Sequence, residues 1–284
     1  MKVLVLGAGG MAGHVMAMVL ADCGLDVTGL AREPVAWVES IVADVRDVES
    51  LSVVTQFDAV VNCVGVLNRA VDASPYSGIW VNSCLPHLLV ELARDSHTRV
   101  IHLSTDCVFS GHEGGGYRED SFRSADTLYG RSKALGEVVD EKNLTLRTSI
   151  VGPDINSNGI GLFTWFMQQS GSVPGYTRVP WSGVTTIALA SAVDAALKQE
   201  LTGLYHLVNN TTISKYDLLG LFNDLRDVPV TLAASDVVQE DKSLIDTRHD
   251  LNFTVPTYAD MVHDMGKWIN EHSQLYPHYQ MKTL

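Results

Sequence analysis

The sequence has few cysteines. Only four occur among 284 residues, and no two of them are close together in the chain: Cys23, Cys63, Cys84 and Cys107. This spacing fits neither a disulfide framework nor a zinc site, so we expect buried, reduced thiols. The ten histidines are also dispersed; His14, His87 and His102 stand within apolar patterns. We expect them to be packing or surface residues and assign no metal.

Positive charge and long apolar runs are scarce as well. Lys and Arg total 20 against 33 Asp and Glu, a net charge of -13. This balance speaks against a general binder of nucleic acids or anionic membranes, and an anionic ligand would need a local cationic pocket. No apolar run is long enough for a signal peptide or a membrane span, so we expect no membrane partner and a cytoplasmic location.

A regular alternation of apolar strand-length runs and helical patterns is present up to about residue 150. The runs cover residues 2–6, 26–30, 59–64, 99–104 and 144–150, and helical patterns cover 12–23, 76–94 and 125–140. This alternation predicts an α/β fold of the Rossmann type, with a doubly wound parallel sheet. The first domain is predicted at 1–150. Residues 151–284 are predicted to form mainly a smaller substrate-binding lobe, whose strands or helices can return to the first domain.

Two inserts interrupt the alternation, at residues 68–77 and 111–124. Both follow the carboxyl ends of strands, where ligands bind in such sheets, so they are interpreted as active-site loops, with simple surface loops as the alternative. Beyond residue 150 the pattern fades, with helices predicted at 186–198, 215–225 and 258–272.

Glycines spaced three apart follow the first strand: Gly7, Gly10 and Gly13. They permit a tight turn and close approach of the backbone to a pyrophosphate, which the following helix N-terminus favours. The candidate cofactor-binding residues are Gly7, Gly10, Met11, Ala12, Gly13, Arg32, Asp44, Val45, Cys63, Val64, Gly65, Ser104, Tyr129 and Lys133. Arg32 stands after the second strand, where an acidic residue would hold the ribose of NAD, so NADPH is the predicted cofactor and NADH a weaker donor.

A proton-transfer group is predicted at the other end of this domain. Tyr129 and Lys133 are four residues apart and share one helix face, so the ammonium can approach the phenol and favour its ionised form. Thr105 ends the fifth strand with a hydroxyl able to donate to a carbonyl oxygen. Thr105, Tyr129 and Lys133 are the predicted catalytic residues of a nicotinamide-dependent enzyme.

These motifs resemble an extended short-chain dehydrogenase/reductase, and within it the dTDP-4-dehydrorhamnose reductase group. The resemblance rests on the glycine turn, on the run from Ser104 to Gly111, on Tyr129-Gly130-Arg131-Ser132-Lys133 and on Leu146-Arg147-Thr148-Ser149. It implies that NADPH reduces the 4-keto group of a nucleotide-linked 6-deoxy-hexose, in surface polysaccharide precursor synthesis. Related dehydratases usually have Glu where this chain has Cys107, so dehydration is not expected. Members that form rhamnose usually have Tyr there, and Trp where this chain has Ile150, so the sugar itself is not fixed.

A nucleoside diphosphate needs cations for its phosphates and a flat apolar surface for its base. Cationic candidates are Arg178, Lys215 and Arg248, and aromatic candidates are Trp165, Tyr176 and Trp181. Arg178 and Trp181 are preferred because they share one loop-like segment. The predicted substrate-binding residues are Val66, Thr105, Asp106, Cys107, Tyr129, Arg178, Trp181 and Arg248.

Two other functions stay open. A sugar-nucleotide epimerase would hold NAD tightly, against which Arg32 argues. A catalytically silent subunit would bind NADP and regulate a partner enzyme, against which the intact Thr105, Tyr129 and Lys133 argue. Amphipathic helices allow a homodimer, but the sequence identifies no pairing face.

Overall fold

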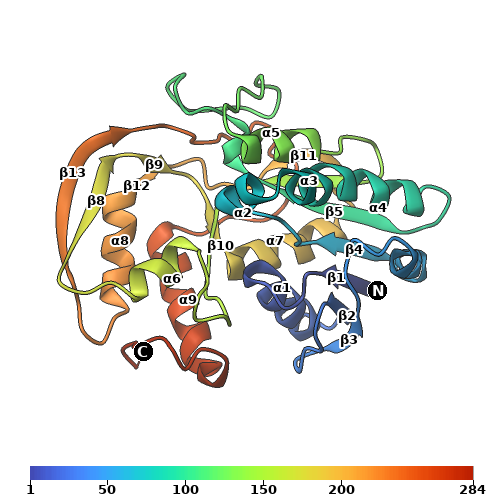
Figure 1. Cartoon of the computed structure of the whole chain (residues 1–284), viewed down its shortest axis with the longest axis horizontal. Helices are drawn as coiled ribbons and strands as arrows, with labels where there is room; N and C mark the ends of the chain where they lie inside the picture. The colour runs from blue at the N-terminus through green and yellow to red at the C-terminus, as the bar shows by residue number, and fades with distance from the viewer. Residues whose placement is uncertain (284) are drawn as a thin grey trace.

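A seven-stranded parallel sheet lies at the centre of the molecule (Figure 1). The computed structural model describes residues 1–283. The strand order is β11-β6-β5-β4-β1-β2-β3, and every neighbouring pair is parallel. The strands are β1 (Lys2–Leu6), β2 (Asp26–Ala31), β3 (Glu39–Val42), β4 (Ala59–Asn62), β5 (Arg99–Ser104), β6 (Leu144–Arg147) and β11 (Gly203–His206). The predicted doubly wound α/β fold is confirmed.

Helices cover both faces of this sheet, as the buried apolar strands require. On one face, α1 (Met11–Asp22) packs against α7 (Thr186–Lys198). On the other lie α3 (Pro75–Ile79), the π-helical segment η2 (Trp80–Cys84), α4 (Leu85–Ala93) and α5 (Leu128–Leu135) (Figure 1). The 3₁₀ segment η1 (Glu49–Gln56) packs against α4.

The later part of the chain builds a second layer of structure beside the sheet. Strands β8 (Ser172–Arg178) and β13 (Thr231–Gln239) pair in parallel, and α8 (Lys215–Asp224) packs on them. Shorter ladders join β7 (Ile150–Val151) to β10 (Val184–Thr185) and β9 (Pro180–Trp181) to β12 (Ile213–Ser214). The remaining helical segments are α6 (Leu162–Met167), α9 (Tyr258–Glu271) and η4 (Ser273–Leu275).

Part of this later chain belongs to the central sheet. Strand β11 adds to the sheet edge beside β6, and α7 covers α1. One hydrophobic cluster extends from Val3 in β1 to Tyr279 near the C-terminus. The domain boundary at residue 150 stays a prediction, because both parts share this core.

Several predicted elements differ from the observed ones. Residues 68–77 were expected as a loop but form α2 (Asn68–Ala73) and the start of α3. The helix predicted at 76–94 is divided by the π-helical segment, and the one predicted at 125–140 shortens to α5. Thr127 caps the start of α5 by accepting a hydrogen bond from the Gly130 amide at 3.1 Å, and Gly136 is its C-cap.

The insert at residues 111–124 is irregular, as predicted, but it is fastened to a distant segment. Tyr117 pairs with residues 243–245 through two backbone hydrogen bonds of 2.9 and 2.8 Å. Glu119 accepts hydrogen bonds from the amide and hydroxyl of Thr247. The prediction of four buried thiols is wrong, since Cys23 and Cys84 are exposed. Within residues 1–283, no helix has the length and apolar character needed to cross a membrane.

Candidate active site

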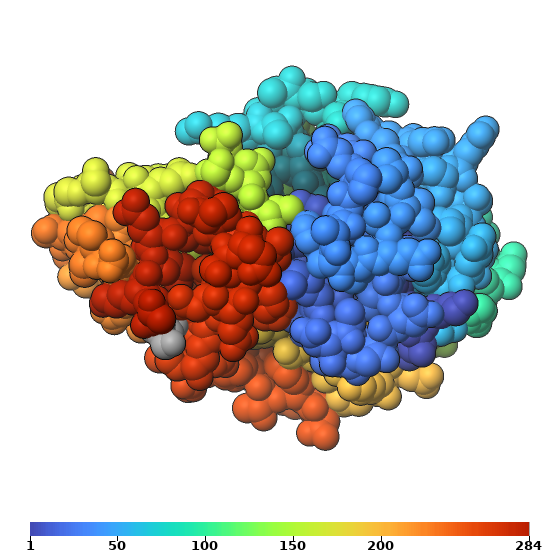
Figure 2. Space-filling view, turned by 90° about the horizontal axis from the view of Figure 1, so that it is seen from below, coloured from blue at the N-terminus to red at the C-terminus, as the bar shows by residue number. Residues whose placement is uncertain are grey.

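A groove of about 830 Å³ runs along the carboxyl ends of β1, β2 and β4. It is visible in Figure 2 as the hollow between the blue N-terminal part and the yellow-green segment after residue 150. The predicted residues that line it are Gly7, Gly10, Arg32, Asp44, Val45, Cys63, Val64, Gly65 and Val66. Ligands of doubly wound sheets bind at this edge, so the groove is the candidate dinucleotide site.

The glycine turn forms a close-fitting cradle at the floor of the groove. Gly7 has φ +79°, and a Cβ on Gly13 would lie 2.0 Å from the Gly7 carbonyl oxygen. Helix α1 can therefore start directly beneath the turn only because both residues lack side chains. Its first amides then point toward the groove, where they can bind a phosphate. Met11, Ala12 and Gly13 belong to this helix and do not line the groove itself.

Two arginines lie at the end of the groove formed by β2 and β3. Arg32 is exposed there, and Arg46 donates to both carboxylate oxygens of Asp44 at 3.0 and 2.6 Å. These bonds and the nearby Arg32 charge lower the pKa of Asp44 to about 2. Asp44, a predicted cofactor-binding residue, is thus held by Arg46. Arg46 was not among the predicted site residues, although the sequence places an arginine two residues after Asp44.

The walls of the groove come from two distant parts of the chain. Trp37 lines one of them, and its buried indole Nε1–H has no hydrogen-bond acceptor among the described residues. Such groups are rare because leaving them unpaired costs free energy. Opposite, Ile155 and Asn156 form a second wall, and Met11 Sδ would be only 2.9 Å from a Cβ on Gly161. The segment around residues 155–161 therefore closes over the glycine turn.

The predicted catalytic residues Thr105 and Tyr129 lie together at the carboxyl end of β5. Thr105 caps the 3₁₀ segment η3 (Asp106–Val108): its hydroxyl accepts from the Cys107 amide at 3.1 Å and donates to Asp106 at 3.0 Å. Tyr129 is 8% exposed. Burial and the neighbouring Cys107 raise its pKa, and its contact with Thr105 only partly offsets this. The phenol is therefore a proton donor in this state, not a phenolate.

Two glycines let α5 approach this site closely. A Cβ on Gly130 would lie 2.1 Å from the Cys107 carbonyl oxygen, and a Cβ on Gly136 would lie 1.9 Å from the Asn82 carbonyl oxygen. Any larger residue would push the helix away from η3 or from the π-helical segment. Asn82 in turn holds both backbone polar groups of Val66, at 2.9 and 2.8 Å. Val66 is thereby fixed between the groove and α5.

Lys133 does not approach Tyr129 as the sequence predicted. Its Nζ donates to the Leu103 carbonyl at 2.6 Å and lies 3.2 Å from Nε2 of His102, both in β5. Burial lowers the pKa of Lys133 to about 8, and its charge does not contribute to the raised pKa of Tyr129. The Lys133 side chain has no other carbonyl acceptor among the described residues, so its Nζ donates to the Leu103 carbonyl beneath the helix.

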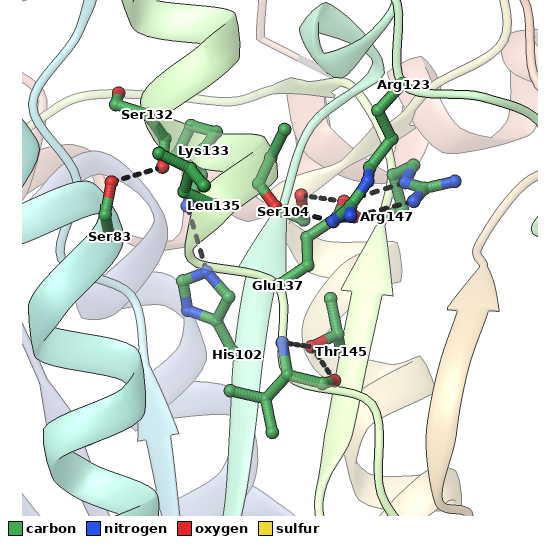
Figure 3. A network of polar contacts seen from close by, with 12 residues as sticks. Ser83, His102, Ser104, Arg123, Ser132, Lys133, Leu135, Glu137, Thr145 and Arg147 are labelled. Carbon is green, nitrogen blue, oxygen red and sulfur yellow. Dashed lines mark hydrogen bonds and ion pairs between the residues drawn. The ribbon is translucent and has the colours of Figure 1, made fainter.

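A buried ion pair lies one turn further along α5, where Glu137 follows the helix (Figure 3). Glu137 accepts from Nε and Nη2 of Arg147 at 2.8 and 2.7 Å, from Ser104 at 2.6 Å and from Arg123 at 3.2 Å. Burial would raise the pKa of Glu137, but the bonds and charge of Arg147 outweigh it and the pKa is lowered. The Ser104 hydroxyl is engaged here, so it is not free for the cofactor contact that was predicted.

Two lysines of the later chain face the turn after β5. Lys215 is the first residue of α8, and burial lowers its pKa while Asp106 and Cys107 raise it. Lys242 pairs with Glu240 at 2.8 Å and also feels the charge of Asp106. Both lysines therefore feel the charge of the turn that follows Thr105. Lys215 had been a secondary candidate, and Lys242 was missed because it lies in an irregular segment.

The preferred substrate residues of the sequence analysis are elsewhere. Trp181 is 3% exposed and packs against the ring of Tyr258 at 5.7 Å, so it belongs to the core. Arg248 donates to Asp250 and to the carbonyls of Thr202 and Leu204, and it lines a separate surface hollow of about 1290 Å³ beside β11. Neither residue lines the groove, and their contacts with the substrate stay predictions.

The other candidates of the second lobe lie on its surface. Arg178 ends β8 with its side chain exposed, and Trp165 and Tyr176 are 39% and 38% exposed. None of the three lines the groove. No group of three or more His, Cys, Asp or Glu side chains in residues 1–283 is arranged to hold a metal ion.

Comparison with known proteins gives a consistent result. Residues 1–230 match the family model described as the RmlD substrate binding domain. A dTDP-4-dehydrorhamnose reductase of Aggregatibacter actinomycetemcomitans is 26% identical over 82% of this chain and 84% of its own. Two crystal structures share the fold. A dTDP-4-dehydrorhamnose reductase of Bacillus anthracis in complex with NADP has a TM-score of 0.79 at 16% identity, covering 93% of this chain and 98% of its own. A UDP-N-acetylglucosamine 4-epimerase of Methanobrevibacter ruminantium has a TM-score of 0.79 at 15% identity, covering 95% and 98%.

Proposed function

The chain belongs to the RmlD substrate binding domain family, and we propose that it uses NADPH to reduce the 4-keto group of a nucleotide-linked 6-deoxy-hexose. The chain is then an oxidoreductase that acts on sugar nucleotides. Its product would enter the synthesis of surface polysaccharide precursors, as the resemblance to this family implies.

One observation carries the proposal: Thr105 and Tyr129 are in contact at the carboxyl end of β5, and Lys133 donates to the Leu103 carbonyl of the same strand. A carbonyl placed there could accept a hydrogen bond from Thr105. Tyr129, protonated in this state, could give its proton to the same oxygen. Lys215 could hold the diphosphate of the substrate by charge.

The groove supports NADPH as the cofactor. The Gly7–Gly13 cradle fits a pyrophosphate, and Arg32 and Arg46 offer cations for a 2′-phosphate. When bound, NADPH supplies the hydride, and the chain's own residues supply the proton and orient the substrate.

Tyr129→Phe tests the proposal against a matched control. Tyr117 also has a buried hydroxyl, which has no partner among the described residues and stacks on Phe109 away from the groove. NADPH oxidation is followed with a panel of nucleotide-linked 4-keto-6-deoxy sugars. We expect the kcat of Tyr129→Phe to fall about 10²- to 10⁴-fold. The kcat of Tyr117→Phe should equal that of the unmodified protein.

Other outcomes would identify the alternatives. Interconversion of sugar nucleotides without net NADPH consumption would indicate an epimerase. Tight NADPH binding with no turnover on any sugar would favour a regulatory subunit. Full activity of Tyr129→Phe would remove Tyr129 from the mechanism and contradict the proposal.

A further inference from the structure

A buried histidine that the proposed mechanism does not use lies directly beneath Lys133. His102 is in β5, is 1% exposed, and lies between Asn62 of β4 and Lys133 of α5 (Figure 3 shows its contact with Lys133). Asn62 Nδ2 is 3.2 Å from His102 Nδ1, and Lys133 Nζ is 3.2 Å from His102 Nε2. Sequence analysis expected His102 to be a packing residue, but each of its ring nitrogens faces a polar group.

The Val64 amide sets the order of donors and acceptors in this series of hydrogen bonds. The Val64 amide can only donate, and it donates to Asn62 Oδ1 at 3.1 Å. This fixes the Asn62 side chain so that its NH₂ group faces His102 Nδ1. Nδ1 must then accept, so the proton of a neutral imidazole is on Nε2 and points at Lys133.

An ammonium group fits this arrangement poorly. It would direct N–H groups at the Nε2–H of His102, and two donors would face each other at 3.2 Å. A neutral amine fits: its lone pair accepts from Nε2–H, while its own N–H donates to the Leu103 carbonyl at 2.6 Å. Each contact from Val64 to Leu103 then joins a donor to an acceptor.

The charges around Lys133 point the same way. Burial lowers its pKa to about 8 even though Glu137, one turn away on the same chain segment, raises it. Burial lowers the pKa of His102 well below its usual value, with smaller contributions from Lys133 and from His87 of α4, so the imidazole stays neutral. Glu137 is itself neutralised by its pairing with Arg147.

We propose that the donor order Val64–Asn62–His102 favours the neutral amine of Lys133 over the ammonium. His102 and Asn62 are thus positioning residues that act through Lys133.

The first test is an NMR titration of the free protein labelled with ¹³C at lysine Cε, with the Lys133 signal identified by its loss in Lys133→Met. We expect Lys133 to titrate with a midpoint at or below about pH 8, well under the ordinary lysine value of about 10.4. A midpoint above about pH 9.5 would overturn the proposal whatever the enzyme activity turns out to be.

Asn62→Asp reverses the donor order. A carboxylate can accept from both Val64 and His102 Nδ1–H, so the tautomer changes and Nε2 becomes an acceptor for an ammonium. We expect the Lys133 midpoint to rise by one pH unit or more. The added negative charge also raises it, so the same substitution is made in a His102→Leu background as a control. An equal rise with and without His102 would show that charge alone acts and would refute the tautomer argument.

Discussion

Arg147→Met should be among the most destabilising single substitutions in this chain. The Arg147 and Glu137 side chains are 1% and 0% exposed, and two hydrogen bonds of 2.8 and 2.7 Å join them. Removing one partner of a buried pair leaves an uncompensated charge, which costs about 3–5 kcal/mol. Arg123 and Ser104 still reach Glu137, so we expect the lower end, about 3 kcal/mol.

Urea and thermal unfolding measure this cost, with Arg94→Met as the control. Arg94 pairs with Glu91, but these side chains are 63% and 57% exposed, so its loss should cost less than about 1 kcal/mol. For a chain of this size, 3 kcal/mol corresponds to a fall in Tm of roughly 6–12 °C. Equal effects of the two substitutions would refute the reasoning, since burial is what distinguishes the pairs.

The double variant and the pH dependence sharpen the test. Adding Glu137→Leu to Arg147→Met removes the stranded charge, so part of the stability should return. The pKa of Glu137 is lowered in the folded protein. Its stabilisation is therefore present above the unfolded pKa and is lost as pH falls through the folded value. The difference between the unmodified protein and Arg147→Met should shrink accordingly in acid.

Five further substitutions address the groove, the substrate and helix α8. Replacing Arg32 or Arg46 with Ser should weaken NADPH binding about tenfold each in fluorescence titrations and leave NADH binding unchanged, because only the 2′-phosphate contact is lost. Lys215→Gln should raise KM for the sugar nucleotide about tenfold with little change in kcat; an unchanged KM would place the diphosphate elsewhere. Gly13→Ala should abolish NADPH binding, since the added Cβ would lie 2.0 Å from the Gly7 carbonyl oxygen. Gly220→Ala is the control, because its Cβ would have no atom within 4 Å, and it should stabilise α8 by about 0.5–1 kcal/mol in urea unfolding.

The fold was predictable because its signals are local. The strands at residues 2–6 and 99–104 match β1 and β5 at both ends, and the helix at 186–198 matches α7. Each is a continuous apolar or periodic segment whose burial does not depend on distant partners. The short helix α2 at residues 68–73 was missed because it has no strong apolar period, and it packs against α5.

The sequence predicted only those parts of the site that lie within one continuous segment. The glycine turn and the Tyr129–Lys133 helix were identified correctly as elements, but the partner of Lys133 was not. Its carbonyl and imidazole partners come from β5, about thirty residues earlier, and no spacing rule connects them. The same holds for Trp181, whose packing against Tyr258 depends on a helix that follows much later.

Three residues spaced four apart join residues 129–137 to the end of β5. Tyr129 and Lys133 share one face of α5, and Glu137 follows the C-cap Gly136. Tyr129 meets Thr105, Lys133 donates to the Leu103 carbonyl, and Glu137 accepts from the Ser104 hydroxyl. The buried ion pair of Glu137 with Arg147 thus holds the same segment that carries the proposed proton donor. We therefore expect a substitution that weakens this pair to reduce turnover as well as stability, although it touches no reacting atom.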